Sequence, residues 1–272
     1  MSRHAGAAAR PAWDPAQYGV FGDERGRPFA DLVARVDLAA PGYVVDLGCG
    51  SGELTAGLAA RWPDAVVDGL DSSAEMIAAA RVHAIPGRLG FAVGDVAEWR
   101  PSRPVDLIVS NAVLQWVPEH VELLPRWIDA LAPGGRLAFQ VPGNFGAPSH
   151  VVLRELCRSP RWRDRLAGTV RDEPVLGPDG YLDLLARLGC SVDAWETTYS
   201  QVLGGEDPVL EWVKGTALRP VLAALGPEET EEFLGVYRAR LREAYPAAPY
   251  GTVFPFRRVF VVAGREERGR RT

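Results

Sequence analysis

Three glycines and a preceding acid in this sequence have the spacing of a site for a nucleotide-like ligand. Gly48, Gly50 and Gly52 alternate directly after an apolar run that contains Asp46. Glycine lets a turn adopt left-handed backbone angles and leaves the main chain open to a ligand, while the start of a helix offers free N–H groups. The stretch therefore predicts a strand, a tight turn and a helix N-terminus that bind such a ligand together.

The glycine spacing also separates two classes of nucleotide ligand. The dinucleotide fingerprint is G-x-G-x-x-G, whereas Gly48, Gly50 and Gly52 form G-x-G-x-G. Two further apolar runs end at Asp71 and at Asp95. An acid after the second strand can accept hydrogen bonds from both ribose hydroxyls, and an acid after the third can meet an adenine amino group. The pattern favours a nucleoside ligand over a dinucleotide, with a turn of incidental glycines as the structural alternative.

Alternating strands and helices are expected to position these residues. Hydrophobic periodicity predicts strands at 43–48, 65–71, 88–94, 105–111 and 136–142, and helices at 52–62, 73–82 and 119–131. Such alternation predicts the α/β class and a Rossmann-like, doubly wound sheet with ligands outside the carboxyl ends of its strands. Two late strands, 192–203 and 257–263, complete seven strands with an antiparallel last strand.

A long insertion between those two late strands predicts a helical cap over the ligand-binding face. Residues 206–246 repeat apolar side chains at helical spacing. The expected division of the chain is a tail and lid at 1–22, a ligand-binding core at 23–143, acceptor-side helices at 144–190, edge strands at 191–204 and 256–264, and the cap at 205–255. Within the first segment, the aromatic residues 13–21 are either a lid over the ligand or a packed surface extension.

Composition narrows the possible partners of the chain. The 272 residues are 47% hydrophobic and carry a formal net charge of −5, which disfavours a nucleic-acid partner held by phosphate contacts. No apolar run reaches the roughly 18 residues of a membrane span, and no signal-peptide pattern is present. The cysteines Cys49, Cys157 and Cys190 lack metal-ligand spacing. We expect a cytoplasmic monomer or weak dimer without metal.

The stretch from Val45 to Gly52 resembles the first motif of the class I S-adenosylmethionine-dependent methyltransferases. The resemblance implies S-adenosyl-L-methionine as cofactor and S-adenosyl-L-homocysteine as product. Met76 then either forms the floor under the adenine or is an ordinary core methionine. The residues expected to bind the cofactor are Asp46, Gly48, Gly50, Asp71, Ser72, Met76, Asp95, Val96, Asn111 and Tyr18.

The residues available for the methyl acceptor favour a carboxylate. A hydroxyl or ammonium nucleophile needs a placed base, and no motif supplies an obvious one. The cap and edge segments instead contain Arg154, Arg219, Arg257 and Arg258. Arginine binds carboxylates bidentately, so these side chains can converge on an anionic acceptor. Each arginine taken singly is more simply a solvated surface charge.

A closer resemblance extends from about residue 12 to 264. The chain is similar to the bacterial trans-aconitate 2-methyltransferases in WDP at 13–15, RGRP at 25–28, NAVLQW at 111–116, QVPGN at 140–144, PSH at 148–150, WETTY at 195–199, WVKGTALRP at 212–220 and FPFRRVF at 254–260. It departs at Gly143, where the family often has Asp, and at Phe145, where it often has Trp.

This second resemblance implies transfer of a methyl group to one carboxylate of trans-aconitate, a small tricarboxylate. No catalytic residue is certain; His150 and Arg219 are the candidates. The residues expected to bind the acceptor are His150, Arg154, Tyr199, Arg219, Tyr250, Arg257, Arg258 and Trp116.

Three other functions fit parts of the sequence. A methyltransferase acting on another small molecule, or on malonyl-carrier protein, has a similar core but in the latter case needs an exposed basic face. A protein that binds S-adenosylmethionine without turnover would have its acceptor cavity filled by side chains. A nucleic-acid methyltransferase would need a basic stripe, which the sequence lacks.

Overall fold

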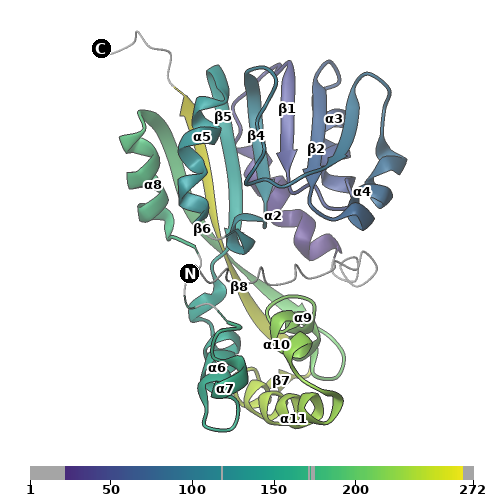
Figure 1. Ribbon diagram of the computed structural model, residues 1–272, viewed down its shortest axis with the longest axis vertical. Coiled ribbons are helices and arrows are strands. Elements are labelled where there is room, and N and C mark those ends of the chain that lie inside the picture. Colours follow the sequence, from purple (N-terminus) through teal and green to yellow (C-terminus); the bar gives the residue numbers. More distant parts are fainter. Residues whose placement is uncertain (1–21, 118, 171, 173–174, 266–272) are drawn as a thin grey trace, which may run out of the picture.

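One mixed sheet forms the centre of the molecule (Figure 1), whose computed structural model describes residues 22–265 except 118, 171, 173 and 174. The strand order is β3-β2-β1-β4-β5-β8-β6, and a short eighth strand, β7, pairs with β8. The predicted seven-stranded sheet with an antiparallel last strand is confirmed, with β7 as an addition. Tyr18 and the predicted lid at 13–21 lie outside the described residues.

The sheet has five parallel strands, and predicted cofactor residues lie at the carboxyl ends of the first four. The strands are β1 (Tyr43–Leu47), β2 (Val66–Asp71), β3 (Leu89–Val93), β4 (Val105–Asn111) and β5 (Leu131–Pro142). β1 is buried along its whole length, as expected for a strand covered on both faces. β5 begins five residues before the predicted strand, because the residues around Gly134 form a register irregularity inside the strand.

Helices cover both faces of the sheet. They are α2 (Gly22–Ala34), α3 (Glu53–Arg61), α4 (Ala74–Ala80), α5 (Leu124–Asp129) and α8 (Pro178–Arg187), with 3₁₀ turns η1 (Arg81–His83), η2 (Leu114–Trp116) and η3 (His120–Glu122). Leu32 of α2 and Leu58 of α3 belong to the core on one face. Trp127 of α5 and Tyr181 of α8 belong to the core on the other. α8, grouped above with acceptor-side helices, therefore packs on the sheet.

A second compact part is joined to the sheet by two long strands. Strands β6 (Cys190–Leu203) and β8 (Gly251–Arg265) run antiparallel and extend beyond the sheet into a group of helices (Figure 1). We call this group the cap. It contains α6 (Pro148–Arg158), α7 (Arg163–Leu166), α9 (Pro208–Lys214), α10 (Arg219–Ala224), α11 (Pro227–Ala244) and β7 (Ala247–Ala248).

The cap has a hydrophobic core of its own. Trp162, Phe233 and Tyr237 are buried in it, and Phe254 of β8 packs against Trp212 of α9. The core includes residues of α6 as well as residues of the predicted insertion. A helical cap of this kind was predicted from the sequence, but the contribution of α6 was expected as a separate segment.

Candidate functional site

The glycine turn after β1 is shaped by close packing at two of its three glycines. Gly48, Gly50 and Gly52 have φ angles of +88°, +53° and +82°. A Cβ at Gly48 would lie 2.1 Å from Cγ2 of Val113, and one at Gly52 would lie 2.8 Å from Cβ of Ala80. A Cβ at Gly50 would meet no atom within 4 Å. Gly48 and Gly52 are therefore needed for packing, whereas Gly50 leaves the main chain open on one side.

Asp71 joins the end of β2 to the glycine turn and to the next helix. Its Oδ2 accepts a hydrogen bond from the main-chain N–H of Gly50 at 2.9 Å, and its Oδ1 accepts one from the N–H of Ser73 at 2.9 Å. Ser73 caps α4 by accepting from the N–H of Met76. Ser72 is exposed, and Met76 is buried.

Asp46 is a buried carboxylate with one unused oxygen. The residue is only 2% exposed, and its Oδ2 accepts a hydrogen bond of 2.6 Å from Oγ1 of Thr55. Its Oδ1 is buried and has no hydrogen-bond partner in the described part of the chain. Burial raises the pKa of Asp46 to about 6, an effect that the Thr55 hydrogen bond opposes and the nearby charge of Asp71 reinforces. A ligand with a hydrogen-bond donor would satisfy the free oxygen.

Polar side chains also lie at the carboxyl ends of β3 and β4. Asp95 follows β3, and its Oδ1 accepts from the N–H of Ala97 at 2.9 Å. Val96 is buried beside it in the sheet core. Asn111 ends β4, and its Oδ1 accepts from Nε2 of Gln140 at 2.5 Å. The acids and amides predicted for the cofactor are therefore aligned along one edge of the sheet.

A buried arginine continues this row on the acceptor side. Arg258 of β8 is 5% exposed, and its Nη1 donates to Oε1 of Gln140 at 3.2 Å. Because the other end of the Gln140 amide donates to Asn111, one side chain of β5 links a predicted cofactor residue to a predicted acceptor residue. The guanidinium of Arg258 also lies over the ring of Phe256, 4.5 Å from its centre.

Tyr199 of β6 lies on the same side of the sheet. Its hydroxyl donates to Oδ2 of Asp31 in α2 at 2.5 Å. Burial and the Asp31 carboxylate raise the pKa of Tyr199, whereas the nearby charges of Arg258 and Arg27 act in the opposite direction. Tyr199 is therefore a neutral hydrogen-bond donor beside a cationic side chain.

His150 is held in place at the start of α6. Its Nδ1 lies 3.2 Å from Oγ of Ser149, and the ring of Phe145 packs edge-on against it. Two tyrosines of the cap fix the main chain here, since Tyr237 donates to the carbonyl of Ser149 and the N–H of Ser149 donates to Tyr245. Burial lowers the pKa of His150 to about 4, with a further contribution from Arg154. His150 is therefore neutral at pH 7.

The other predicted acceptor residues are more dispersed. Nε of Arg154 lies 3.5 Å from Oδ1 of Asp172, although its side chain is mostly buried. Arg257 is bound to Glu196 by two hydrogen bonds of 2.5 and 2.8 Å on the outer face of β8. Arg219 begins α10 and is partly buried, and Trp116 of η2 is exposed.

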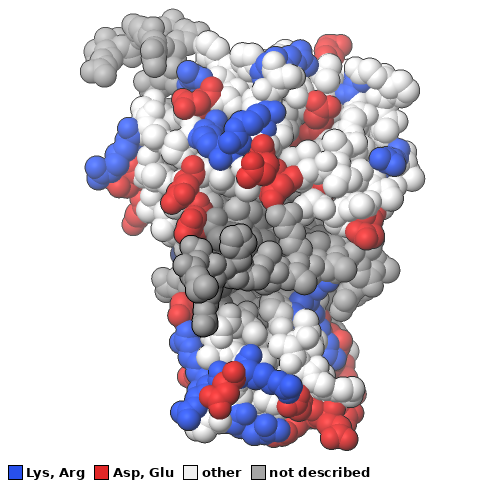
Figure 2. All heavy atoms as spheres, in the orientation of Figure 1, with Lys and Arg blue, Asp and Glu red and all other residues white. Residues whose placement is uncertain are grey.

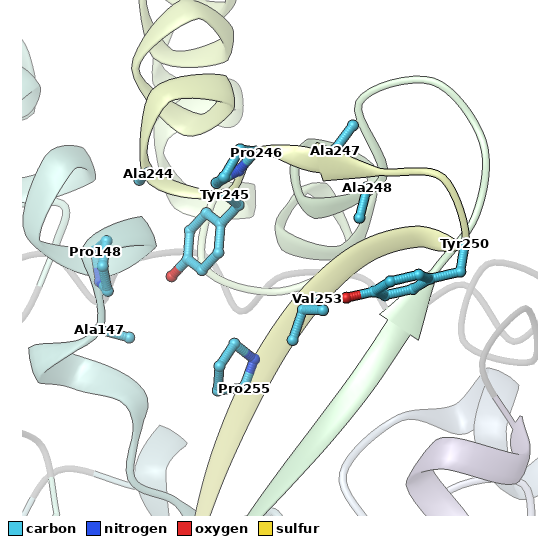
Figure 3. A pocket seen from close by; sticks show the side chains of 10 residues that line it. All are labelled: Ala147, Pro148, Ala244, Tyr245, Pro246, Ala247, Ala248, Tyr250, Val253 and Pro255. Carbon is cyan, nitrogen blue, oxygen red and sulfur yellow. The ribbon is translucent and has the colours of Figure 1, made fainter.

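Tyr250 lies apart from this group. It is 69% exposed and belongs to the lining of an apolar cavity of about 530 Å³ on the cap (Figure 3). Val253 and Pro255 line the same cavity from the exposed face of β8, which is opposite the buried face of Phe254, Phe256 and Arg258. The structure therefore does not bring Tyr250 together with Arg258.

Comparison with known proteins decides the family. A family model described as a methyltransferase domain matches residues 44–135. The trans-aconitate 2-methyltransferase of Streptomyces avermitilis is 58% identical over 266 residues, which are 95% of this chain and 99% of that protein. The chain belongs to the trans-aconitate 2-methyltransferase family. The family member from Streptomyces coelicolor is 56% identical, with 96% of this chain and 89% of that protein covered.

The fold of this family member also has a solved counterpart. A putative methyltransferase from Bacillus halodurans has a TM-score of 0.57, with 14% sequence identity over 89% of this chain and 100% of that one. At this low identity the likeness concerns the fold alone.

Two residues of the site, Gln140 and Asn144, had no role assigned from the sequence. Gln140 is a polar residue inside the apolar, buried segment 137–141 of β5, and Asn144 follows the end of that strand. A polar residue in the most buried part of a sheet indicates a functional or structural role. Its partners on β4 and β8 could not be known without the strand pairing.

Proposed function

We propose that this protein transfers the methyl group of S-adenosyl-L-methionine to one carboxylate of trans-aconitate, giving a monomethyl ester and S-adenosyl-L-homocysteine. The observation that carries the proposal is 58% identity to a trans-aconitate 2-methyltransferase over nearly the full length of both proteins. Arg258, buried beside the carboxyl ends of β4 and β5, supports it because a small anionic acceptor needs a buried cation.

The glycine turn and the acids of β1–β3 fit the cofactor. Asp46 has a buried oxygen without a hydrogen-bond partner in the described chain, and Gly50 leaves space beside the main chain. We assign Asp46, Gly48, Gly50, Asp71, Ser72, Met76, Asp95, Val96 and Asn111 to the cofactor. Tyr18 remains a proposed contact outside the described residues.

The acceptor's carboxylate is the nucleophile, and the protein positions it. The bound cofactor supplies a sulfonium methyl group, which is already a strong electrophile, so a carboxylate needs no base to attack it. Arg258 binds a carboxylate of the acceptor that does not react. Arg219 and Arg154 of the cap are further proposed cations for the acceptor, whereas Arg257 is bound to Glu196. Alignment alone can account for ~7 to 11 kcal/mol of a reaction barrier in favourable cases.

We assign proton transfer to neither His150 nor Tyr199. With a pKa of about 4, His150 is neutral at pH 7 and a weak base. When its Nδ1 accepts from Ser149, its Nε2 carries the proton and donates. Tyr199 acts through its position next to Arg258, because its hydroxyl already donates to Asp31.

A free acid fits the site better than a carrier protein. A carrier protein requires an exposed basic surface, but the side chains of Arg154 and Arg258 are mostly buried. On the face shown in Figure 2, basic and acidic side chains are interspersed over both the sheet and the cap. Exposed acidic and basic residues of the cap also form ion pairs, as in Arg161 with Glu232. This surface also gives no support to a nucleic-acid acceptor.

Two further observations concern partners. No helix among the described residues has the length and apolar character needed to cross a bilayer. The same residues contain no group of three or more histidine, cysteine or acidic side chains arranged to hold a metal ion. We propose a cytoplasmic location and a monomer or weak dimer.

Transfer of a labelled methyl group tests the proposal. The enzyme is incubated with labelled S-adenosylmethionine and trans-aconitate, malonyl-carrier protein, a phenol or an amine. Selective, base-labile labelling of trans-aconitate is expected, because esters hydrolyse in base. If the cofactor binds but no acid is labelled, the acceptor assignment fails and the chain is left as a binding protein for the cofactor.

A further inference from the structure

A buried amide next to the predicted acceptor residues has an unused donor. Asn144 lies in the 3₁₀ turn η4 (Asn144–Gly146), directly after β5, and is 3% exposed. Its Nδ2 is buried and has no hydrogen-bond partner in the described part of the chain. Leaving such a group unpaired is costly, and buried polar groups without a partner are rare in native proteins.

The orientation of this amide is fixed by its other end. Oδ1 of Asn144 accepts a hydrogen bond of 2.6 Å from the main-chain N–H of Arg257. Because an N–H can only donate, the atom that receives this bond must be the oxygen and not the nitrogen. The NH₂ group is therefore the end of the amide that does not accept from Arg257, and it has two hydrogens to donate.

The surroundings of Asn144 are those of the acceptor. The ladder between β5 and β8 continues past Pro142, since the N–H of Gly143 donates to the carbonyl of Arg257. Arg258, the next residue of β8, has the buried guanidinium bound to Gln140. On the other side, Phe145 packs against His150. Asn144 is thus bound to the residue of β8 that precedes Arg258, and its chain neighbour Phe145 contacts His150.

We propose that Asn144 binds the acceptor by donating from Nδ2 to a carboxylate oxygen. This inference rests on the proposed function, because it requires an anionic acceptor at the ends of β5 and β8. An amide complements the arginine there: it adds a directed hydrogen bond without a second charge. Asn144 then contributes to the choice of a carboxylate acceptor over one that presents hydrogen-bond donors.

The variant Asn144→Asp separates this role from a structural one. The aspartate has the shape of asparagine and still accepts from the N–H of Arg257, but it replaces the donor by a second anionic oxygen. We expect the KM for trans-aconitate to rise about 10- to 100-fold, while the KM for S-adenosylmethionine stays within about twofold, the scatter of such measurements.

Asn111→Asp is the matched control, since Asn111 and Asn144 are the two asparagines of the chain. It makes the same change on the cofactor side of Gln140. The ratio of the acceptor KM to the cofactor KM should rise in Asn144→Asp and not in Asn111→Asp. An unchanged acceptor KM in Asn144→Asp, or an equal change of the ratio in both variants, would overturn the inference.

A measurement on the unmodified protein does not depend on the kinetics of either variant, and one folded variant is enough to assign the signals. Labelling with ¹⁵N-asparagine gives two side-chain NH₂ signals, which follow from the two asparagines, and the Asn111→Asp or Asn144→Asp spectrum assigns them. Trans-aconitate added to protein saturated with S-adenosylhomocysteine should shift the Asn144 signal. A signal that stays in place at saturating acceptor would reject the contact. If the unmodified enzyme methylates trans-aconitate, these failures concern Asn144 alone; if it does not, the proposed function fails first.

Discussion

The two halves of the candidate site are built in different ways. On the cofactor side, the polar groups lie at the carboxyl ends of successive strands and accept hydrogen bonds from nearby main-chain N–H groups. Asp71 accepts from Gly50 and Ser73, and Asp95 accepts from Ala97. On the acceptor side, the contacts join distant segments, as when Arg258 donates to Gln140 and Tyr199 donates to Asp31. A local arrangement can be recognised from spacing, whereas a distant one depends on how strands pair.

This difference has a consequence for charged residues. The three acids of the cofactor side lie on strands of one parallel sheet, so their common edge follows from the fold class. The arginines of the acceptor side lie on β8 and on cap helices, and some of them are bound to acids of the protein itself. Arg257 is occupied by Glu196, and Arg154 lies near Asp172. Residue type alone does not say which arginine is available to a ligand.

The largest expected effect distinguishes two adjacent arginines of β8. Arg258→Ala should lower kcat/KM for trans-aconitate by about 100- to 1,000-fold, because truncating a buried charge leaves its partner unpaired. Arg257→Ala should change it by less than about threefold, because an exposed ion pair contributes little. Steady-state kinetics with each variant measures both. A larger loss in Arg257→Ala would reverse the assignment of the two side chains.

The next effect compares two glycines of the turn. Gly48→Ala should weaken cofactor binding by about 30-fold or more, because its Cβ would lie 2.1 Å from Val113 and its φ is +88°. Gly50→Ala has no such clash and should cost only about 1 kcal/mol from its backbone conformation. Calorimetric titration with S-adenosylhomocysteine gives both affinities. Equal losses would show that packing against Val113 is not the reason for Gly48.

A smaller effect concerns pH, because Asp46 and His150 titrate in opposite senses. Burial raises the pKa of Asp46 from 3.8 to about 6. Between about pH 4 and 6 the carboxyl is therefore ionised in the unfolded protein but protonated in the folded one, so the contribution of Asp46 to the free energy of unfolding falls as pH rises. Burial lowers the pKa of His150 from 6.5 to about 4, so the unfolded imidazole binds a proton that the folded one does not, and its contribution rises with pH over the same range.

Two variants should therefore change the pH dependence of stability in opposite directions. Asp46→Asn removes the contribution that falls with pH, so the free energy of unfolding should increase more steeply between pH 4 and 6. His150→Gln removes the contribution that rises with pH, so the increase should be less steep. Each change should amount to about 2 kcal/mol over that interval. Urea unfolding at several pH values, with the unmodified protein as reference, measures the slopes. Parallel curves for all three proteins would contradict the burial of these two groups.

The smallest expected effect comes from Tyr250. Because it is 69% exposed, at an apolar cavity away from Arg258, Tyr250→Ala should leave the KM for trans-aconitate within about twofold, as for most exposed substitutions. Tyr199→Phe is the matched comparison, since it removes the hydroxyl that binds Asp31. A strong effect at Tyr250 would place the acceptor on the cap's outer face.

The sequence was sufficient for the sheet and for the cofactor edge, for a physical reason. Strand and helix periodicities are local, and the acids Asp46, Asp71 and Asp95 each follow an apolar run directly. Finer features were not predictable: β5 begins at Leu131 because a bulge near Gly134 continues the ladder with β4. The capping of α4 by Ser73 was not predicted either.

The acceptor side was predicted only in part, because its geometry is non-local. Arg258 and His150 were predicted from residue type and resemblance. The roles of Gln140 and Asn144 could not be predicted, because they depend on hydrogen-bond partners on β4 and β8. Burial on one face of β8 separates Arg258 from Tyr250 and Arg257, and that face is set by strand pairing. Ion pairs such as Arg257 with Glu196 also depend on the register of β6.

The ladder between β6 and β8 therefore controls more than sheet stability. It runs through 14 successive residue pairs, from Cys190 opposite Arg265 to Leu203 opposite Thr252. Shifting a strand by one residue exchanges its two faces, so a slip of β8 would turn Arg257 inward and Arg258 outward. Glycines lie near both ends: a Cβ at Gly251 would lie 2.8 Å from the carbonyl oxygen of Leu203, and one at Gly264 would lie 2.7 Å from Oγ of Ser191. The proposed role of Arg258 in binding the substrate thus depends on the register of β6 and β8, which Gly251 and Gly264 help to fix.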